Sequence, residues 1–352
     1  MFDIAIIGAG ISGLVCAQQL TQAGYKVVVV EKSRGLGGRV ATRRLHNTLA
    51  DHGASYLEPN GVLQQLVQVL SDRHLLQVWT DTVYEWSPQQ QLQSSIPTPR
   101  YVAPTGMSAI AKFFATGLEV RLNQRVQAIT LTADKYWQLS FEPTRDVTPP
   151  LTSQAVVIAI PAPQALMLLS TTDLDTEFLE RLRLQEFDPC LSVIAGYSTE
   201  LQQPAWKAVN LAHPDLSWIG LDSSKRMATE QPVFVLHSSA EFAQRYLEAE
   251  DLQPAGDHLL AQAAALLPGL ETPEWMQVHR WRYAFPRRPW HDSCLSADSL
   301  PLVCCGDWCG TSSNLRNRVE NAMVSGLAAA TKINSQLQQR SLPGINFIDL
   351  LN

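Results

Sequence analysis

The chain has 352 residues, of which 45% are hydrophobic and 17% are charged, and its net charge at pH 7 is −6. This length suits two domains of ordinary size, and the acidic balance leaves no basic surface for a nucleic-acid partner. No apolar run is long enough to span a membrane and no basic segment opens the chain, so we expect a cytoplasmic protein with neither a signal peptide nor a membrane partner.

The N-terminal segment predicts a βαβ unit. Residues 4–7 (IAII) indicate a buried strand, apolar residues within 14–20 recur at helical spacing, and a second apolar run at 27–30 (VVVV) ends in Glu31. An acidic residue at this point is typical of a dinucleotide site, because its carboxylate can accept hydrogen bonds from the adenosine ribose. The same carboxylate repels a 2′-phosphate, so we do not expect NADP at this site.

The turn between the first strand and the helix reads GAGISG, which is the G-x-G-x-x-G pattern of nucleotide-binding turns. We expect Gly8 to allow the tight turn, Gly10 to let a pyrophosphate approach the backbone, and Gly13 to let the helix pack close to the strand. Ile11 and Ser12 would then lie in the first helical turn, whose unpaired N–H groups favour a phosphate.

Features far from this turn favour FAD over NAD. A glycine-rich basic loop, 32–44 (KSRGLGGRVATRR), follows the second strand, and an apolar strand near the C-terminus ends in Gly306 and Asp307. We expect Arg39 to pair with the pyrophosphate and Asp307 to accept a hydrogen bond from a ribityl chain. A helix starting near Arg318 could point its positive N-terminal end at the flavin ring. A plain NAD domain would continue with further βα units instead.

The middle of the chain indicates a second domain. Apolar strands typical of a mixed sheet occur between residues 190 and 285, and two helices are predicted within 241–266. Residues 87–99 are polar and proline-rich, which indicates a loop or an exposed hairpin. We therefore predict a discontinuous FAD-binding domain (1–70, 101–163 and 292–345) that brackets a substrate domain (71–100 and 164–291).

The cysteines do not indicate a metal site. No C-x-x-C pair occurs, and the spacing near the C-terminus does not suit zinc. We expect buried free thiols at all six positions, which are Cys16, Cys190, Cys294, Cys304, Cys305 and Cys309.

Several motifs in order carry a family resemblance. The strings GAGISG…EKSRGLGGR and GDW…RVENAMVSG look like the flavin-containing amine oxidase superfamily. More narrowly, the chain resembles the renalases, including their bacterial branch, through ADHGASY, YVAPTGMSAI, DPCLSVIAGY, HRWRYAFP and CCGDWC. The match spans nearly the whole chain with similar spacing.

This resemblance implies an α/β fold with a Rossmann-like FAD-binding domain and a mixed β-sheet substrate domain, the architecture of p-hydroxybenzoate hydroxylase and the amine oxidases. It implies non-covalent FAD, because the context of Cys309 differs from that of the covalent cysteine in the monoamine oxidases. The predicted cofactor-binding residues are Gly8, Gly10, Ile11, Ser12, Gly13, Glu31, Lys32, Gly38, Arg39, Ser55, Tyr56, Val126, Asp307 and Val319.

The renalase resemblance also implies an activity. Such enzymes oxidise 2- and 6-dihydro isomers of NAD(P)H to NAD(P)+ by hydride transfer to flavin N5, and O2 is then reduced to H2O2. Trp281 and Tyr283 alternate along a predicted strand and can share one face over the flavin, although core aromatic residues would show the same spacing. His237 and Asn210 complete the predicted catalytic set, and each can equally be an ordinary sheet residue.

Three other functions remain open from the sequence. A flavin-dependent amine oxidase would use Trp281 and Tyr283 as an aromatic cage for a neutral amine. A protoporphyrinogen-type oxidase would need a longer apolar channel or a membrane-binding face, and the sequence contains no segment typical of either. A non-catalytic flavin-binding redox or interaction module is the fourth possibility. We expect a monomer or a weak dimer in each case.

Overall fold

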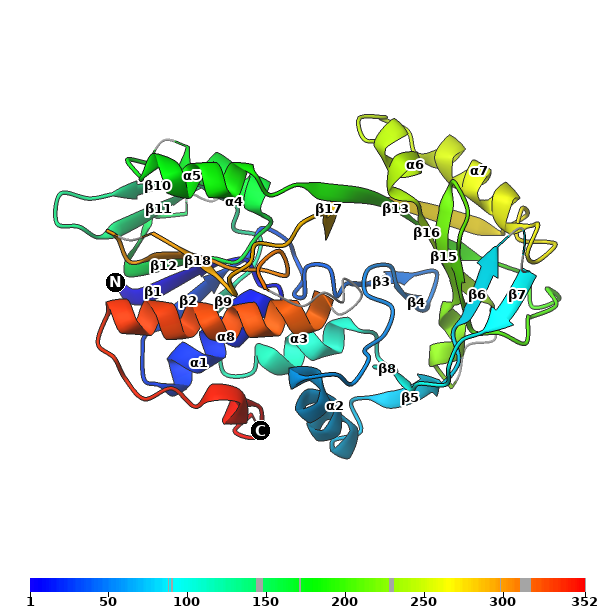
Figure 1. Cartoon of the computed structure of the whole chain (residues 1–352), viewed down its shortest axis with the longest axis horizontal. Coiled ribbons are helices and arrows are strands. Elements are labelled where there is room, and N and C mark those ends of the chain that lie inside the picture. Colours follow the sequence, from blue (N-terminus) through cyan, green and yellow to red (C-terminus); the bar gives the residue numbers. More distant parts are fainter. Residues whose placement is uncertain are drawn as a thin grey trace.

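The computed structural model describes residues 1–87, 89, 91–143, 148–170, 172–227, 231–297, 299–310 and 318–351. These residues form two lobes, each built on one β-sheet, and the chain crosses between the lobes several times (Figure 1). The first lobe contains both ends of the described chain, and the second sheet is formed by the middle of the chain.

The first sheet is a Rossmann-like sheet with a parallel centre. β1 pairs in parallel with β2 on one side and with β12 on the other, while β9 extends the sheet beyond β2 and β19 pairs in parallel with β12. β10 and β11 form the antiparallel edge. The strands are β1 (Phe2–Ile7), β2 (Val27–Val30), β9 (Val120–Arg121), β10 (Val126–Leu131), β11 (Trp137–Phe141), β12 (Leu151–Ile158), β18 (Leu295–Ser296) and β19 (Leu302–Cys304).

Helices cover both faces of this sheet (Figure 1). α1 and α8 pack against each other on one face, where Gly326 of α8 lies so close to α1 that an added Cβ would be 2.4 Å from the Ser12 carbonyl oxygen. Helices on that side are α1 (Ile11–Gln22), α2 (Val62–Asp72), α3 (Ser108–Phe114), α8 (Arg318–Gln336) and the short 3₁₀ helix η2 (Gly344–Ile348). The predicted βαβ unit and the C-terminal helix are confirmed.

The opposite face of the first sheet is covered by α4 (Ala162–Leu169) and α5 (Thr176–Arg183). Ala165, Phe178 and Leu182 are buried in the same core as residues of β1 and β2. The predicted domain boundary at residue 164 is therefore wrong, because it falls inside α4 and the apolar faces of both helices pack on the first sheet. The structure moves this boundary beyond α5.

The second sheet has seven strands in the order β17-β13-β16-β15-β14-β6-β7. All neighbours are antiparallel except β14 and β6, so the sheet is mixed, as predicted. The strands are β6 (Tyr84–Ser87), β7 (Gln91–Ser94), β13 (Phe187–Gly196), β14 (Ala208–Leu211), β15 (Leu216–Leu221), β16 (Val233–Ser238) and β17 (Trp275–Pro286).

One face of the second sheet is covered by α6 (Ala240–Arg245) and α7 (Gln253–Ala263), which confirms the two predicted helices. The other face is turned toward the first lobe, and Ile194, Trp218 and Val235 on it are buried in the same core as residues of α1 and α2. Two further elements lie between the sheets: the hairpin β3 (Thr42–Leu45) and β4 (Thr48–Asp51), and the pair β5 (Gln77–Thr80) and β8 (Arg100–Val102).

No helix in the described part of the chain combines the length and apolar character needed to cross a lipid bilayer.

Candidate functional site

The predicted nucleotide-binding residues gather at one edge of the first sheet. β1, β2, β12 and β19 are parallel, so the loops after their carboxyl ends lie at the same edge. In open α/β sheets this edge is where nucleotides bind. The sequence places the GAGISG turn after β1, Glu31 after β2 and Asp307 shortly after β19.

The glycine turn fits a dinucleotide. Gly8 has φ +106°, and a Cβ at Gly13 would lie 2.1 Å from the Gly8 carbonyl oxygen, so α1 can approach β1 only with glycine at both positions. A Cβ at Gly10 would meet no atom within 4 Å, which leaves open space beside the backbone there. Gly10 is also the N-cap of α1 and provides no side-chain cap, so N–H groups of the first turn are left for a phosphate.

Glu31 is buried and oriented by the backbone. Its Oε2 accepts a hydrogen bond from the Ala9 N–H at 2.9 Å, and its Oε1 accepts one from the Ser33 N–H at 2.8 Å. A carboxylate has about four acceptor sites, so two remain for ribose hydroxyl groups. The neighbouring Lys32 is exposed.

Arg39 and Asp307 form a bidentate ion pair. Arg39 Nη1 lies 2.8 Å from Asp307 Oδ2, and Arg39 Nη2 lies 2.5 Å from Oδ1. Asp307 is buried, whereas the Arg39 side chain is 29% exposed, so Arg39 still has surface available to a phosphate. Gly38, with φ +56°, approaches Gly10 across the two loops. The sequence suggested each residue as a separate flavin ligand and did not indicate that they contact one another.

The other predicted cofactor residues lie on different elements. Ser55 and Tyr56 follow β4, and Tyr56 lies beneath the Arg100 guanidinium, 5.5 Å from ring centre to Cζ. Val126 begins β10 and is buried, and Val319 is in the first turn of α8. The structure describes these positions, and their contacts with FAD stay predictions.

The face of the second sheet that is turned toward the first lobe carries a row of polar and aromatic side chains. Strand register places five residues directly opposite one another in turn across five strands. Because side chains of paired residues lie on the same face, these five form one continuous row. The row is Asn210, Trp218, His237, Ser192 and His279.

The sequence predicted two members of this row and missed the others. Asn210 and His237 were predicted, but they lie two strands apart, about 10 Å, and the Asn210 amide donates to Glu85 Oε1 at 2.8 Å. Trp281 and Tyr283 are two and four residues beyond His279 on β17, so they share its face. Tyr283 packs edge-on against Phe187. No local pattern marked Trp218 or His279, because register across strands cannot be read from spacing within a strand.

His52 directly follows β4 and contacts this face of the second sheet from the side of the first lobe. Its ring stacks on Trp281 at 5.2 Å between centroids and meets His279 edge-on at 4.8 Å. The Trp281 indole Nε1 donates to the His52 carbonyl oxygen at 2.9 Å. Arg43 Nη2 lies 3.0 Å from His279 Nδ1. We call His52, His237, His279 and Trp281 the histidine wall.

The three imidazoles of the histidine wall are neutral near pH 7. Burial lowers the pKa of His52 to about 3, with His279 and Arg43 contributing in the same direction. Burial also lowers the pKa of His237 to about 4, assisted by Arg318, and that of His279 to about 4, assisted by Arg43. Within the described structure, His52 Nδ1 and His237 Nε2 are buried without a hydrogen-bond partner.

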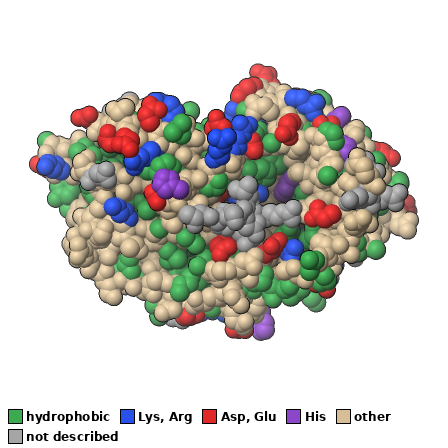
Figure 2. Space-filling view, in the orientation of Figure 1, with side chains coloured by type: hydrophobic (Ala, Val, Ile, Leu, Met, Phe, Trp, Pro, Cys, Tyr) green, Lys and Arg blue, Asp and Glu red, His purple; other side chains and the backbone are tan. Residues whose placement is uncertain are grey.

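Positive charge dominates around the wall. Arg43 contacts His279, and the half-buried Arg318 lies near Asp307, Arg39 and His237. Burial lowers the pKa of Arg318 to about 10, which leaves it protonated at neutral pH. Figure 2 shows the surface hollowed between the two lobes, with Lys and Arg side chains at the rim of the hollow.

A buried four-charge cluster fastens the hairpin to the second sheet. Lys225 lies 3.2 Å from Asp51 Oδ2 and 2.6 Å from Asp222 Oδ1, while Arg226 lies 3.0 Å from Asp51 Oδ2 and 2.6 Å from Asp222 Oδ2. The side chains of Asp51, Asp222 and Lys225 are 0% exposed. The two cations hold the pKa of Asp51 below its usual range. Because Asp51 precedes His52, this cluster fixes the strand end that presents His52 to Trp281.

The cysteines are free thiols, five of them buried and Cys294 partly buried. Burial raises the pKa of Cys305 to about 12 and that of Cys309 well above its usual value, so neither is a thiolate at neutral pH. In the described part of the chain, no group of three or more His, Cys, Asp or Glu side chains is arranged to hold a metal ion, the three wall histidines included.

Comparison with known proteins identifies the family. Residues 6–72 match the NAD(P)-binding Rossmann-like domain, and residues 84–334, more than half of the chain, match the flavin containing amine oxidoreductase family. (S)-6-hydroxynicotine oxidase of Paenarthrobacter nicotinovorans is 40% identical over 60 residues, which are 16% of this chain and 14% of that protein. L-amino-acid oxidase of Echis ocellatus is 55% identical over 42 residues, 12% of this chain and 8% of that protein. The aligned segments thus span only about one seventh or less of these curated relatives.

Solved structures agree with the fold over almost the whole chain. Putrescine oxidase has a TM-score of 0.70 at 16% identity, covering 95% of this chain and 99% of that one. Cyclohexylamine oxidase from Brevibacterium oxydans IH-35A has a TM-score of 0.71 at 14% identity, covering 96% and 99%. These likenesses confirm the predicted fold class. Together with the family match, they show that the chain belongs to the flavin-containing amine oxidoreductase family, whose cofactor is FAD.

Proposed function

We propose that this protein is a renalase-like, FAD-dependent oxidase of 2- and 6-dihydro isomers of NAD(P)H. The balanced reaction is dihydro-NAD(P) + O2 + H+ → NAD(P)+ + H2O2. FAD, when bound, accepts the hydride and passes the electron pair to O2. The residues expected to hold FAD are those at the edge of the first sheet, with Glu31 at the ribose and Arg39 at the pyrophosphate.

The observation that carries this proposal is the positive charge beside the neutral histidine wall. Arg43 contacts His279 and Arg318 lies near His237, whereas the nearby carboxylates of Asp307 and Asp51 are each paired with a cation, Asp307 with Arg39. A cationic ammonium substrate gains nothing from such surroundings. A substrate that carries phosphates is attracted by them, and both dihydro isomers carry at least two.

The protonation state of the wall supports the same choice. An amine substrate must lose a proton before oxidation, and imidazoles with pKa values of about 3 and 4 are too weakly basic to remove it near pH 7. A dihydropyridine needs no base, because loss of hydride alone gives the aromatic pyridinium. The wall then has to hold the donor carbon about 3–3.5 Å from its acceptor and exclude water. The flat, half-buried indole of Trp281 suits a planar ring.

Flavin-dependent amine oxidation is the second candidate. The family match and the aromatic surface of Trp281 support it, because a neutral amine can enter an aromatic site already deprotonated from solution. The positive charges beside the histidine wall do not favour amine oxidation. They also do not oppose it when the amine is uncharged.

Anaerobic mixing separates the two candidates. Purified yellow protein is mixed separately with the 2-dihydro isomer, the 6-dihydro isomer, ordinary NADH and a panel of primary amines, and the flavin absorbance is followed. Rapid bleaching by the isomers, with slow or no bleaching by amines, is the expected result. Bleaching by an amine while the isomers leave the flavin oxidised would overturn the proposal in favour of amine oxidation.

A further inference from the structure

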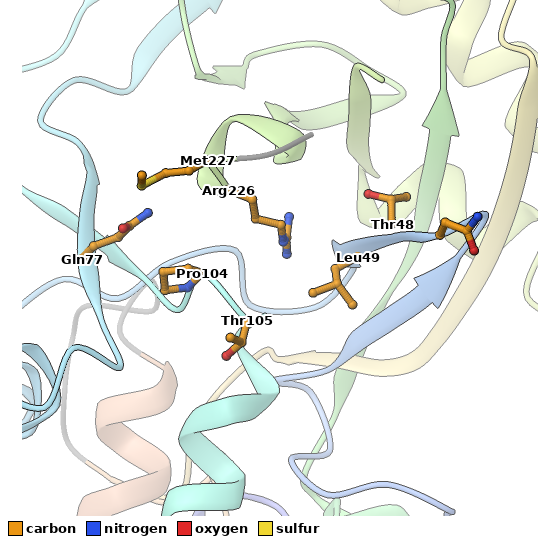
Figure 3. Close-up of a pocket in the computed structure, with 8 residues that line it drawn as sticks. Thr48, Leu49, Gln77, Pro104, Thr105, Arg226 and Met227 are labelled. Atoms are coloured by element: carbon orange, nitrogen blue, oxygen red, sulfur yellow. The ribbon is translucent and has the colours of Figure 1, made fainter. Parts of the chain in front are cut away.

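Two adjoining pockets lie on the hairpin formed by β3 and β4. The larger has a volume of about 390 Å³ and is bounded by the hairpin, Gln77, Pro104 and the segment at Arg226 (Figure 3). The smaller has a volume of about 150 Å³. Leu49 and Thr105 line both, so the two form one continuous depression, which we call the hairpin pocket.

Most of the hairpin residues that line the hairpin pocket lie on the face of the hairpin opposite to the histidine wall. Thr42 and Arg44 alternate with Arg43 along β3, and Leu49 and Asp51 share the face of their partners Arg44 and Thr42. Arg43, on the other face, contacts His279. The hairpin pocket is therefore separate from the wall, and its smaller part borders the glycine-rich loop through Gly35 and Leu36.

The smaller part of the pocket is cationic. Arg44 and Lys112 line it, together with the hydroxyl-bearing Thr42 and Ser108. Both cations are exposed, and neither makes an ion pair with another residue that the structure describes. Two other surface arginines of this protein, Arg282 and Arg287, differ.

Arg282 pairs with Glu248, and Arg287 pairs with Asp188 and Glu186, so those cations are already neutralised. No acidic side chain occurs among the described residues that line either part of the hairpin pocket. The unpaired charge of Arg44 and Lys112 is therefore free to attract an anion.

The larger part is suited to a flat organic group. Leu49, Pro104 and Met227 supply apolar surface, and the amides of Asn47 and Gln77 can hydrogen-bond to the edge of a ring. Its wall at Arg226 is rigid, because that guanidinium is held by Asp51 and Asp222 in the buried cluster. A volume of this size is typical of small-molecule sites, and a preformed wall reduces the entropy lost on binding.

We propose that the hairpin pocket binds a nucleoside phosphate, with the phosphate against Arg44 and Lys112 and the base against Leu49 and Pro104. This site is additional to the FAD site, and its existence does not depend on which molecule reduces the flavin. Two sources share this chemistry: a free nucleotide, or the adenosine phosphate end of a dinucleotide substrate.

The test is calorimetric titration of AMP into protein saturated with FAD, so that the cofactor site is filled. The double variant R44Q/K112Q should bind AMP at least tenfold more weakly than the unchanged protein. The control variant K332Q removes an exposed charge on α8, far from the pocket in sequence and element, and should bind AMP as the unchanged protein does. Because all three positions are exposed, the variants should retain their unfolding midpoints.

Adenosine and inorganic phosphate, titrated separately, should each bind at least tenfold more weakly than AMP. Absence of AMP binding at millimolar concentration, or equal binding by R44Q/K112Q, would overturn the proposal. Inorganic phosphate binding as tightly as AMP would overturn the assignment of the base to the larger part. Where AMP binds as expected, competition with flavin reduction by the dihydro isomers identifies the dinucleotide as the source, and lack of competition identifies a free nucleotide.

Discussion

The edge of the first sheet and the face of the second sheet differ in how their side chains are brought together. At the edge, the key contacts are local: Gly8, Gly10 and Gly13 lie within one turn, and Glu31 closes the same βαβ unit. At the face, the row from Asn210 to His279 is assembled from five strands and exists only through their register. A site built locally can be recognised from a pattern, whereas one built by register needs the structure.

The largest expected effect on stability comes from the buried four-charge cluster, which joins the hairpin to the second sheet. Lys225→Met leaves Asp51 and Asp222 with one cation between them in a fully buried site, which should lower the free energy of unfolding by about 3–5 kcal/mol. Urea denaturation measures the loss. The double variant D222N/K225M keeps the charges balanced and should lose clearly less; an equal loss in both variants would contradict a role for charge balance.

The local character of the edge can be tested with two glycines. Gly13→Ala puts a methyl group 2.1 Å from the Gly8 carbonyl oxygen and should destabilise the protein by about 3 kcal/mol. Gly10→Ala has open space around its Cβ, so its thermal midpoint without FAD should be unchanged while FAD binding weakens. Equal thermal midpoints for the two apoproteins would show that α1 and β1 are not as close as described.

The Arg39–Asp307 pair is a non-local contact at the edge. Arg39→Ala and Asp307→Asn should each weaken FAD binding about tenfold, which corresponds to about 1.4 kcal/mol. Because each residue orients the other, the double variant should be little weaker than either single variant. Flavin retained after gel filtration and fluorescence titration give the values. Strictly additive losses would mean that the residues bind FAD independently.

The stability contributed by the histidines at the face of the second sheet should depend on pH. Folding lowers the pKa values of His52, His237 and His279 below the usual 6.5, so the unfolded chain binds more protons than the folded one between about pH 4 and 6.5. Stability from these groups is complete above pH 6.5 and is lost as the pH falls toward 4.

His237→Gln should reduce the loss of unfolding free energy between pH 7 and pH 5 by on the order of 1 kcal/mol. A pH profile that is the same for His237→Gln and the unchanged protein would mean that His237 is protonated in the folded state.

The smallest effect is expected at Trp281. Trp281→Phe keeps an aromatic face on His52 and removes the hydrogen bond to the His52 carbonyl, which should cost about 1 kcal/mol of stability. If Trp281 holds the reacting ring, anaerobic flavin reduction should slow more than this small loss explains. Reduction at the unchanged rate would place the reacting ring elsewhere on the face.

What the sequence could and could not predict depends on the same difference between local contacts and contacts made through strand register. The strand, turn and helix around Gly8–Gly13 were predictable because 2- and 3.6-residue periodicities and glycine geometry act over a few positions. The contact of Arg39 with Asp307 joins segments 268 residues apart and could not be read from either one. Helices α4 and α5 were assigned to the wrong domain, because an amphipathic helix shows that it packs but not on which sheet. His279 and Trp218 looked like ordinary strand residues until register aligned them with His237.

The most direct test of the account is the stoichiometry of a complete turnover in air. Each dihydro isomer is incubated with the holoenzyme, and NAD(P)+ and H2O2 are quantified against the isomer consumed. One NAD(P)+ and one H2O2 are expected for each isomer oxidised, with no peroxide from primary amines. Peroxide and aldehyde formed from an amine, with the isomers left unconsumed, would contradict it.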